Sequence, residues 1–375
     1  MATRGALSYA VSSQIALKEV LMGKLRGLFI LDEEAYEMVY GPDERRAIAR
    51  HVDIVGPPQT RQSIVERTDL LAVTEAIFSG WGAPILDEAF LNAAPQLKVL
   101  FYGAGSTSVC LTPSVWKRGI VVTSAYAANA IPVAEYTLSM ILFSLKHGWR
   151  LMRELRDHRP HTNRNTALGC YGTTVGLVSL GIIARTLLKL LGSFDLRVLA
   201  FDPYVSEEQA SALGVTLVSL DEIFRQSDVV SLHTPLLAET IGMIRGDHFS
   251  QMKRGATFIN TARGEVVREA EMREVLKRRP DLQAVLDVTE HEPTLPESPL
   301  FDLPNVVLTP HLAGSVGNEC LRMGQYMVEE LERYIQNKPL KWAITPELAE
   351  YTSHRPVSVT TSLATKHSKR VIAAT

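Results

Sequence analysis

The sequence predicts an α/β protein with two Rossmann-like or flavodoxin-like parallel-sheet domains and a cleft between them. Short apolar runs alternate with helical patterns along most of the chain. A glycine-containing turn joins one of these runs to a helix near residue 180. The length of 375 residues exceeds what a single hydrophobic core usually holds, which favours two domains.

Composition argues against several classes of protein. The chain carries 39 Lys and Arg against 41 Asp and Glu, a net charge of −2, so we expect no general attraction to nucleic acid or to a membrane surface. The longest apolar run, residues 131–145, contains Glu135 and is shorter than the roughly 18 residues of a membrane span. Cys110, Cys170 and Cys320 have no paired spacing, which indicates a reducing, cytoplasmic compartment and no metal site.

The first domain is expected over residues 25–126, after an N-terminal extension, residues 1–24, whose first part faintly resembles a transit peptide. The alternation of strand and helix patterns predicts a parallel sheet with both faces covered. The predicted strands are 25–31, 51–55, 76–78, 98–101 and 120–123, and the predicted helices are 36–50, 63–68 and 86–93.

The second domain is expected over residues 127–312. Asn129 is predicted to cap a long helix that reaches about residue 155, and residues 156–170 form a polar arm. Residues 313–345 follow the sheet and include a predicted helix over 315–336. Residues 346–375 form a Ser/Thr-rich basic tail, which is expected either to be solvated or to contact a partner. Six strands, enough for a dinucleotide-binding sheet, are predicted over 174–178, 196–201, 229–232, 257–260, 284–288 and 306–309.

The turn after residues 174–178 reads Ser179-x-Gly181-x-x-Ala184, a variant of the dinucleotide-binding glycine pattern without its first glycine. Gly181 permits close approach of a pyrophosphate, although a plain strand-to-helix connection is an equally good interpretation of the turn alone. Asp202 follows Ala184 by 18 residues and ends the next strand, where a carboxylate would bind a ribose hydroxyl and repel a 2′-phosphate. We therefore expect NAD rather than NADP.

Arg263, Glu292 and His311 each follow an apolar strand of the second domain. A guanidinium can bind a carboxylate through two hydrogen bonds, and an imidazole can exchange a proton near neutral pH. A neighbouring carboxylate can stabilise the charged imidazole. Taken singly, each residue has a better structural interpretation: Arg263 as part of an ion pair, Glu292 as a solvated loop charge and His311 as a buried histidine. Their joint occurrence after a dinucleotide turn predicts a redox site for hydroxy acids.

These motifs, taken together, resemble the D-isomer-specific 2-hydroxyacid dehydrogenase family over about residues 25–344. The segments that carry the resemblance are 103–105, 129–135, 175–184, 227–235, 252–264, 286–293 and 309–315.

The resemblance implies a role for each of these residues. Arg263 would bind and polarise a 2-oxo acid, His311 would be the acid/base, Glu292 would keep His311 protonated, and Asp287 would meet the nicotinamide carboxamide. The first domain would be the substrate domain, to which the last helix returns. The implied cofactor-binding residues are Ser179, Leu180, Gly181, Ile182, Ile183, Asp202, His233, Thr234, Pro235, Thr261, Ala262, Asp287 and His311. The implied substrate-binding residues are Trp81, Gly103, Ala104, Gly105 and Arg263.

The leading hypothesis is an NAD-dependent enzyme that interconverts a 2-oxo acid and a D-2-hydroxy acid and forms a homodimer, as the family implies. Two departures from the family are Ser179 and a chain too short for the regulatory domain of some phosphoglycerate dehydrogenases. Formate dehydrogenases of the same superfamily have an amide where Glu292 stands, so the carboxylate favours hydroxy acids. The alternatives are an NAD-sensing scaffold that resembles the C-terminal-binding corepressors and a non-catalytic NAD-binding oligomer.

The substrate prediction depends on residues 77–84, which contain Phe78 and Trp81 but no Lys or Arg. A phosphorylated substrate would need a cationic partner there. We therefore expect unphosphorylated 2-oxo acids, although Trp81 could serve only to pack its own domain and Arg61 could supply an anion site.

Overall fold

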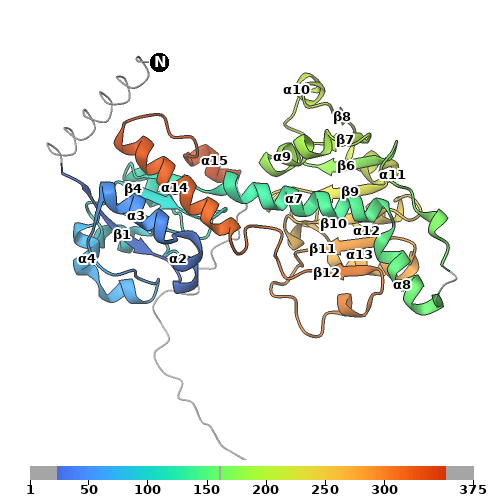
Figure 1. Ribbon diagram of the computed structural model, residues 1–375, viewed down its shortest axis with the longest axis horizontal. Helices are drawn as coiled ribbons and strands as arrows, with labels where there is room; N and C mark the ends of the chain where they lie inside the picture. The colour runs from blue at the N-terminus through green and yellow to red at the C-terminus, as the bar shows by residue number, and fades with distance from the viewer. Residues whose placement is uncertain (1–22, 160–161, 352–375) are drawn as a thin grey trace, which may run out of the picture.

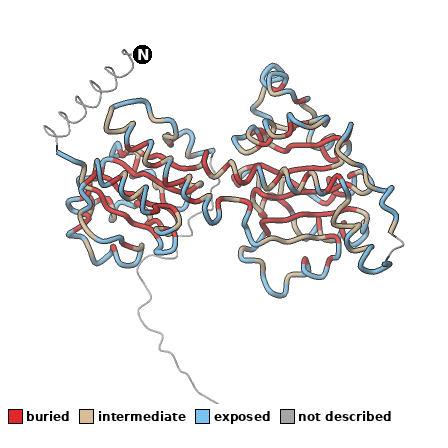
Figure 2. Tube along the Cα trace, in the orientation of Figure 1, coloured by how far each residue is buried: buried red, intermediate tan, exposed pale blue. Residues whose placement is uncertain are grey.

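The computed structural model describes residues 23–159 and 162–351, so most of the predicted N-terminal extension and of the basic tail lies outside the described residues. Two parallel sheets, each covered by helices, form two lobes joined by the long helix α7 (Tyr126–Leu145) (Figure 1). The predicted fold class is confirmed. Figure 2 shows that the central strands of both sheets are buried, whereas the outer faces of the covering helices are exposed.

The first lobe is built on a five-stranded sheet in the order β2-β1-β3-β4-β5. Phe78 and Phe101 stack at its centre with their ring centroids 5.1 Å apart, and both are fully buried. The strands are β1 (Leu25–Ile30), β2 (Val52–Ile54), β3 (Ala76–Ser79), β4 (Val99–Tyr102) and β5 (Val121–Ser124). The helices are α2 (Glu33–Val39), α3 (Pro42–His51), α4 (Thr68–Val73), α5 (Glu88–Ala93) and α6 (Pro113–Lys117), with a 3-10 turn at Ser63–Glu66.

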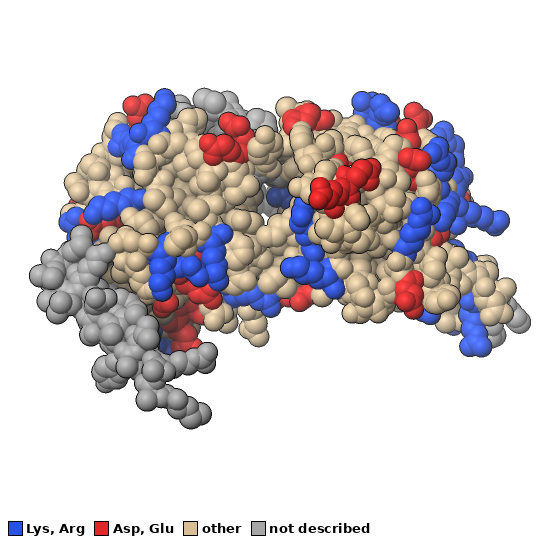
Figure 3. Space-filling view, turned by 90° about the horizontal axis from the view of Figure 1, so that it is seen from above, with Lys and Arg blue, Asp and Glu red and all other residues tan. Residues whose placement is uncertain are grey.

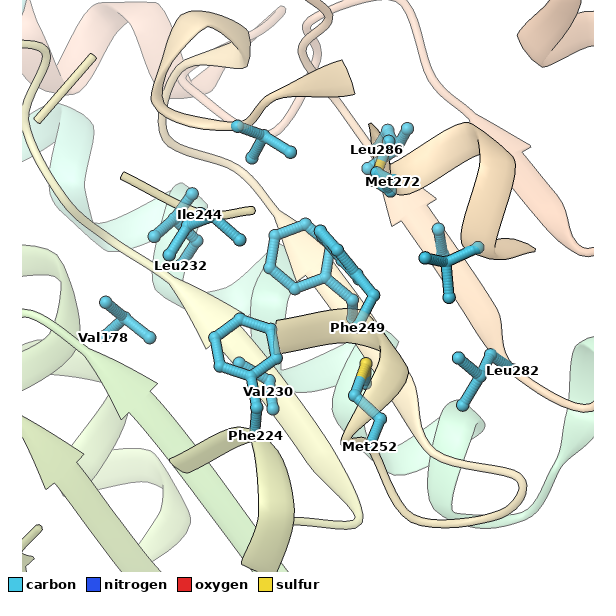
Figure 4. Close-up of a cluster of buried hydrophobic side chains, with 14 of the residues drawn as sticks. Val178, Phe224, Val230, Leu232, Ile244, Phe249, Met252, Met272, Leu282 and Leu286 are labelled. Atoms are coloured by element: carbon cyan, nitrogen blue, oxygen red, sulfur yellow. The ribbon is translucent and has the colours of Figure 1, made fainter. Parts of the chain in front are cut away.

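The second lobe has a seven-stranded sheet in the order β12-β11-β10-β9-β6-β7-β8. Phe224, Phe249 and their aliphatic neighbours fill the core on one of its faces (Figure 4). The strands are β6 (Thr174–Val178), β7 (Arg197–Phe201), β8 (Thr216–Leu217), β9 (Val229–Leu232), β10 (Thr257–Asn260), β11 (Gln283–Leu286) and β12 (Val306–Leu308). The helices are α9 (Ile182–Leu191), α10 (Glu207–Ala212), α11 (Leu220–Gln226), α12 (Gly246–Ser250) and α13 (Glu269–Arg278), with 3-10 turns at Gly264–Val266 and Pro299–Asp302.

Helix α7 starts at the end of β5 in the first lobe and runs along the second lobe, where it packs against α9. By length and composition alone this helix could span a membrane. Half of its apolar stretch is buried inside the protein, however, as is typical of the core helix of a globular domain. Helix α14 (Glu319–Ile335) carries the chain back to the first lobe and packs on α2 and α3, and the short α15 (Pro346–Glu350) follows it.

The chain crosses between the lobes twice, and Asn129 joins the two crossings. Its side-chain oxygen accepts a hydrogen bond from the backbone N–H of Ser315, at 2.8 Å. The prediction that Asn129 caps the helix is wrong, because α7 begins one turn earlier with Ala125 at the N-cap position. Asn129 therefore lies inside the helix and uses its amide for a contact between distant segments.

Four further predictions about the elements are wrong. The helix expected over residues 36–50 is divided, because Gly41 and Pro42 end α2 and start α3. The helix expected to reach residue 155 breaks at His147, whose φ of 50° is left-handed, and continues as α8 (Gly148–His158). The second sheet gains β8 as a seventh strand, and the last long helix begins at Glu319 rather than at residue 315.

Candidate active site

The site lies where three neighbouring strands of the second sheet end. Arg263 follows β10, Glu292 comes after β11 and His311 follows β12, and these strands pair in that order. Parallel strands place their carboxyl ends at one edge, so the three side chains converge there. They line a cavity of about 820 Å³ together with Trp81 of the first lobe. Figure 3 shows a hollow between the two lobes, with both acidic and basic side chains on each of them.

His311 and Glu292 form a pair within this cavity. The Nδ1 atom of His311 lies 2.8 Å from Oε1 of Glu292, and 53% of the imidazole but only 15% of the carboxylate is exposed. The His311 backbone has a φ of 51°, a left-handed conformation that residues other than glycine adopt uncommonly and at some cost in strain. Its N–H donates to the backbone carbonyls of Asp287 and Thr309, each at 3.0 Å, so neighbouring strand ends hold the strained residue in place.

Asp287 fixes the loop that carries His311. Its carboxylate is 2% exposed and accepts hydrogen bonds from the Thr309 hydroxyl at 2.6 Å and from the backbone N–H groups of Leu312 and Ala313 at 2.9 Å. A buried carboxylate with three donors is a strong anchor, because the donors replace the water that it lost. The structure thus gives Asp287 a positioning role beside the nicotinamide contact that the family resemblance implies.

Tyr136 on α7 extends this network and was missed at the sequence level. Its hydroxyl lies 2.8 Å from Oγ1 of Thr309. Since Thr309 gives its one hydrogen to Asp287, Tyr136 must be the donor to Thr309. Burial raises the pKa of this phenol, so it keeps its proton at neutral pH. Only its position directly after the segment 129–135, on the same helix, could have drawn attention to it.

Arg263 is held by a compact loop after β10. Asn260 braces this loop, because its side-chain amide donates to the Arg263 carbonyl at 3.0 Å and its oxygen accepts from the N–H of Ala262 at 2.9 Å. One guanidinium nitrogen of Arg263 donates to the Ala262 carbonyl at 2.6 Å. Glycine is required at Gly264, because a Cβ there would collide with the backbone of Thr289 in the neighbouring loop.

The glycine turn is open on the side where a pyrophosphate would bind. Gly181 is the N-cap of α9, no side chain caps that helix, and a Cβ built on Gly181 would meet nothing within 4 Å. Ile182 and Ile183 begin the helix, so their N–H groups are available to an anion at its positive end. The residues present therefore fit the pyrophosphate of a dinucleotide.

Ser179 adopts the conformation that the missing glycine would have taken easily. Its φ is 75°, and its hydroxyl lies 2.9 Å from Oγ1 of Thr234 on the next loop. The hydrogen bond between the two hydroxyls offsets part of the strain, which for such a residue is on the order of 1 to 3 kcal/mol.

This geometry predicts that Ser179→Gly leaves NADH affinity unchanged or improves it, because glycine relieves the strain at the expense of one hydrogen bond. Ser179→Ala is the matched control, since it loses the same hydroxyl and keeps the strain, and it should be the least stable of the three proteins. NADH fluorescence titrations and thermal unfolding would measure both effects. A large loss of NADH affinity in both variants would mean that the Ser179 hydroxyl contacts the phosphates.

Asp202 lies at the end of β7, directly beside the glycine turn. Its carboxylate accepts from the backbone N–H of Leu180 at 2.7 Å and from that of Tyr204 at 2.9 Å. Two oxygens offer about four lone-pair directions, so acceptor capacity remains for a ribose hydroxyl. Asp202 thus ties the turn to the strand end in addition to its predicted role.

The other predicted cofactor residues follow β9 and β10. His233 is buried, which lowers its pKa to about 4, and its Nδ1 atom has no partner among the described residues. An unpartnered buried nitrogen is unusual and fits a group that the bound cofactor would satisfy. Thr234 contacts Ser179, Pro235 accepts a hydrogen bond from Thr240, and Thr261 and Ala262 form the start of the Arg263 loop.

The glycine segment after β4 lies deeper than expected. Ala104 is 1% exposed, and the N–H of Gly103 donates to the Ser79 carbonyl at 2.7 Å, so Ala104 and Gly105 remain as the predicted carboxylate donors. The cavity wall is formed instead by residues just beyond it that the sequence did not single out, namely Ser106, Ser108 and Val109. Within residues 23–159 and 162–351, no group of three His, Cys, Asp or Glu side chains could hold a metal ion.

Comparisons with known proteins identify a family model, relatives and solved structures to which this chain is similar. Residues 138–313 match the family model described as "D-isomer specific 2-hydroxyacid dehydrogenase, NAD binding domain". The chain is 33% identical over 260 residues to D-3-phosphoglycerate dehydrogenase of Archaeoglobus fulgidus, covering 69% of this chain and 49% of that protein. It is 32% identical over 279 residues to glyoxylate reductase of Korarchaeum cryptofilum, covering 73% of this chain and 82% of that protein. A crystal structure of a protein from Thermus thermophilus superposes with a TM-score of 0.64 at 27% identity, covering 86% of this chain and 100% of that one.

The chain spans about half the length of the D-3-phosphoglycerate dehydrogenases that it matches. The glyoxylate reductase, by contrast, is covered over most of its length at a comparable identity. The matched NAD-binding domain confirms the prediction that the cofactor is NAD. The protein therefore belongs to the D-isomer-specific 2-hydroxyacid dehydrogenase family.

Proposed function

We propose that this protein is an NAD-dependent D-2-hydroxyacid dehydrogenase that interconverts a 2-oxo acid and the corresponding D-2-hydroxy acid. The observation that carries the proposal is the 2.8 Å His311–Glu292 pair, which lines the same cavity as Arg263. An imidazole paired with a carboxylate is suited to proton transfer, and a nearby guanidinium is suited to a carboxylate substrate. Residues 25–126 would then be the substrate domain and residues 127–312 the cofactor domain.

In the proposed mechanism, the guanidinium of Arg263 binds the substrate carboxylate and polarises its 2-oxo group, helped by the N–H groups of Ala104 and Gly105. NADH, held at the glycine turn and by Asp202, would supply a hydride for the carbonyl carbon. Because Nδ1 of His311 faces Glu292, Nε2 is the nitrogen that delivers the proton to the carbonyl oxygen. The face that Arg263 and the glycine segment present sets the configuration of the product.

The test is NADH oxidation with a panel of 2-oxo acids that includes glyoxylate, hydroxypyruvate and 3-phosphohydroxypyruvate. Turnover with at least one unphosphorylated acid is expected, with a higher kcat/KM than for the phosphorylated one. The absence of turnover across the panel, together with tight NADH binding, would instead favour the corepressor-like scaffold. The relatives named above are a dehydrogenase and a reductase, which does not favour that alternative.

Glu292→Gln should lower kcat for reduction by about tenfold or more. The carboxylate lies 2.8 Å from Nδ1 of His311, and glutamine keeps its shape but removes the charge that supports proton delivery from the imidazole. Turnover of 2-oxo acids would measure the effect, with NADH affinity as the control, and wild-type turnover would show that Glu292 does not act on His311.

Asp202→Ala should erode the preference for NADH over NADPH. The carboxylate would bind the ribose hydroxyl and repel a 2′-phosphate, and alanine does neither. Asp202→Asn is the control, since it keeps an oxygen for the N–H of Leu180 or of Tyr204 while removing the charge. The ratio of kcat/KM values for the two cofactors is the measurement, and equal use of both by the wild type would refute the assignment.

We also propose a cytoplasmic homodimer. Helix α8 has no buried residue, and its Met152 and Leu155 side chains are 55% and 54% exposed. Leu168 and Tyr171 on the following arm are 49% and 86% exposed, and a second copy could cover all four. The three free cysteines support a reducing compartment. Sedimentation of the wild type and of Met152→Glu would test the dimer, since a charge in this interface should yield monomers.

A further inference from the structure

Three large apolar side chains in the active-site cavity are unusually exposed. Trp81 and Val109 of the first lobe are 37% and 45% exposed, and Phe301 of the second lobe is 57% exposed. Each faces the cavity that also contains Arg263 and His311. Apolar side chains gathered in a concave site lose their contact with water when a ligand binds, and this favours an apolar ligand group.

The charges in the cavity oppose a second anionic group on the substrate. Among the described residues that line it, Arg263 is the one Lys or Arg, His311 is already paired with Glu292, and Asp287 and Glu292 are acids. The proposed mechanism already uses Arg263 for the carboxylate of the 2-oxo acid. Arg61 does not line the cavity, and its Nε donates to the Ala83 carbonyl at 2.8 Å. A phosphate or second carboxylate would therefore be poorly compensated.

We propose that the substrate is a 2-oxo acid with a large apolar side chain, about the size of a phenyl ring, that packs against Trp81, Val109 and Phe301. This inference rests on the proposed dehydrogenase function and adds the substrate class to it. Two of the three side chains are aromatic, and aromatic pairs prefer edge or offset contacts that an aromatic substrate can make.

The competing explanation is that these three side chains pack against one another when the lobes close. Kinetics with two substrates can separate the explanations, because closure contacts would serve every substrate equally. Pyruvate and phenylpyruvate share the reacting atoms and differ in the size of the apolar group. Each buried methylene is worth about fourfold in binding, so the wild type should prefer phenylpyruvate by roughly 10- to 100-fold in kcat/KM.

The variant Phe301→Ala should lower kcat/KM for phenylpyruvate by about tenfold and leave that for pyruvate within about twofold. Leu295→Ala is the matched control, because Leu295 is also 43% exposed in the second lobe but does not line the cavity. NADH titrations of each variant would verify that the second lobe is intact.

Each possible result bears on the inference. Selective loss with phenylpyruvate supports it. Equal losses with both substrates, equal use of both by the wild type, or a clear preference for 3-phosphohydroxypyruvate would overturn it while leaving the dehydrogenase proposal standing. If no 2-oxo acid were reduced, the proposed function itself would fail, and the substrate class would fail with it.

Discussion

His311→Ala is expected to lower kcat for 2-oxo acid reduction by about 10² to 10⁴, the usual contribution of a positioned acid/base. The imidazole is half exposed in the cavity and 2.8 Å from Glu292, and no other imidazole lines this cavity among the described residues. NADH binding should persist, because the glycine turn lies on a different strand end. Stopped-flow reduction and NADH fluorescence would separate the two effects.

Two further variants control for the strained backbone at position 311. His311→Asn should lose as much activity as His311→Ala, although asparagine tolerates the left-handed φ of 51° better than alanine. His291→Ala removes a neighbouring exposed imidazole and should retain wild-type turnover. If either variant of His311 retained most of its turnover, His311 would not be the proton donor.

Asp287→Asn is expected to lower the free energy of unfolding by about 2 to 4 kcal/mol and kcat by about tenfold to a hundredfold. An amide offers one acceptor oxygen, whereas the carboxylate receives three donors, from Thr309, Leu312 and Ala313. At least one buried N–H would then face an NH₂ group. Because these donors hold the loop of His311, the loss of stability and the loss of activity should occur together.

Tyr136→Phe provides a graded comparison, since it removes only the outermost hydrogen bond of the same network. Its cost in stability should be about 0.5 to 1.5 kcal/mol, with a correspondingly smaller fall in kcat and an unchanged KM for NADH. Tyr126→Phe on the same helix is the control, because the Tyr126 ring instead packs edge-on against Trp342. Wild-type stability and turnover in Asp287→Asn would show that the network does not position His311.

Local sequence was enough to predict most strands, because buried parallel strands are short apolar runs between turn residues. The break between α2 and α3 also has a local signal, because Gly41 precedes Pro42. The prediction missed this break, because the helical pattern continues on both sides of it. The break at His147 carries a weaker signal, since only the following glycine marks it. β8 has two residues, too few for any periodicity.

The predicted residues of the site that follow strands β10 to β12 do come together, because parallel strands bring their carboxyl ends to one edge. What could not be predicted depends on contacts between distant segments. The contacts of Asn129 with Ser315 and of Tyr136 with Thr309 join residues more than 170 positions apart. Phe301 belongs to a 3-10 turn, and nothing in its neighbours indicates that it lines the cavity.

The hydrogen bond between Asn129 and Ser315 has a mechanical consequence. Two chain crossings that were independent would let the lobes slide and twist as well as rotate. A 2.8 Å hydrogen bond joins them at one point, so sliding of one lobe past the other should be restricted while rotation about the region of that bond remains possible. Trp81 and Phe301 would then approach each other mainly by rotation of the lobes, which would change the width of the cavity more than the alignment of its two walls.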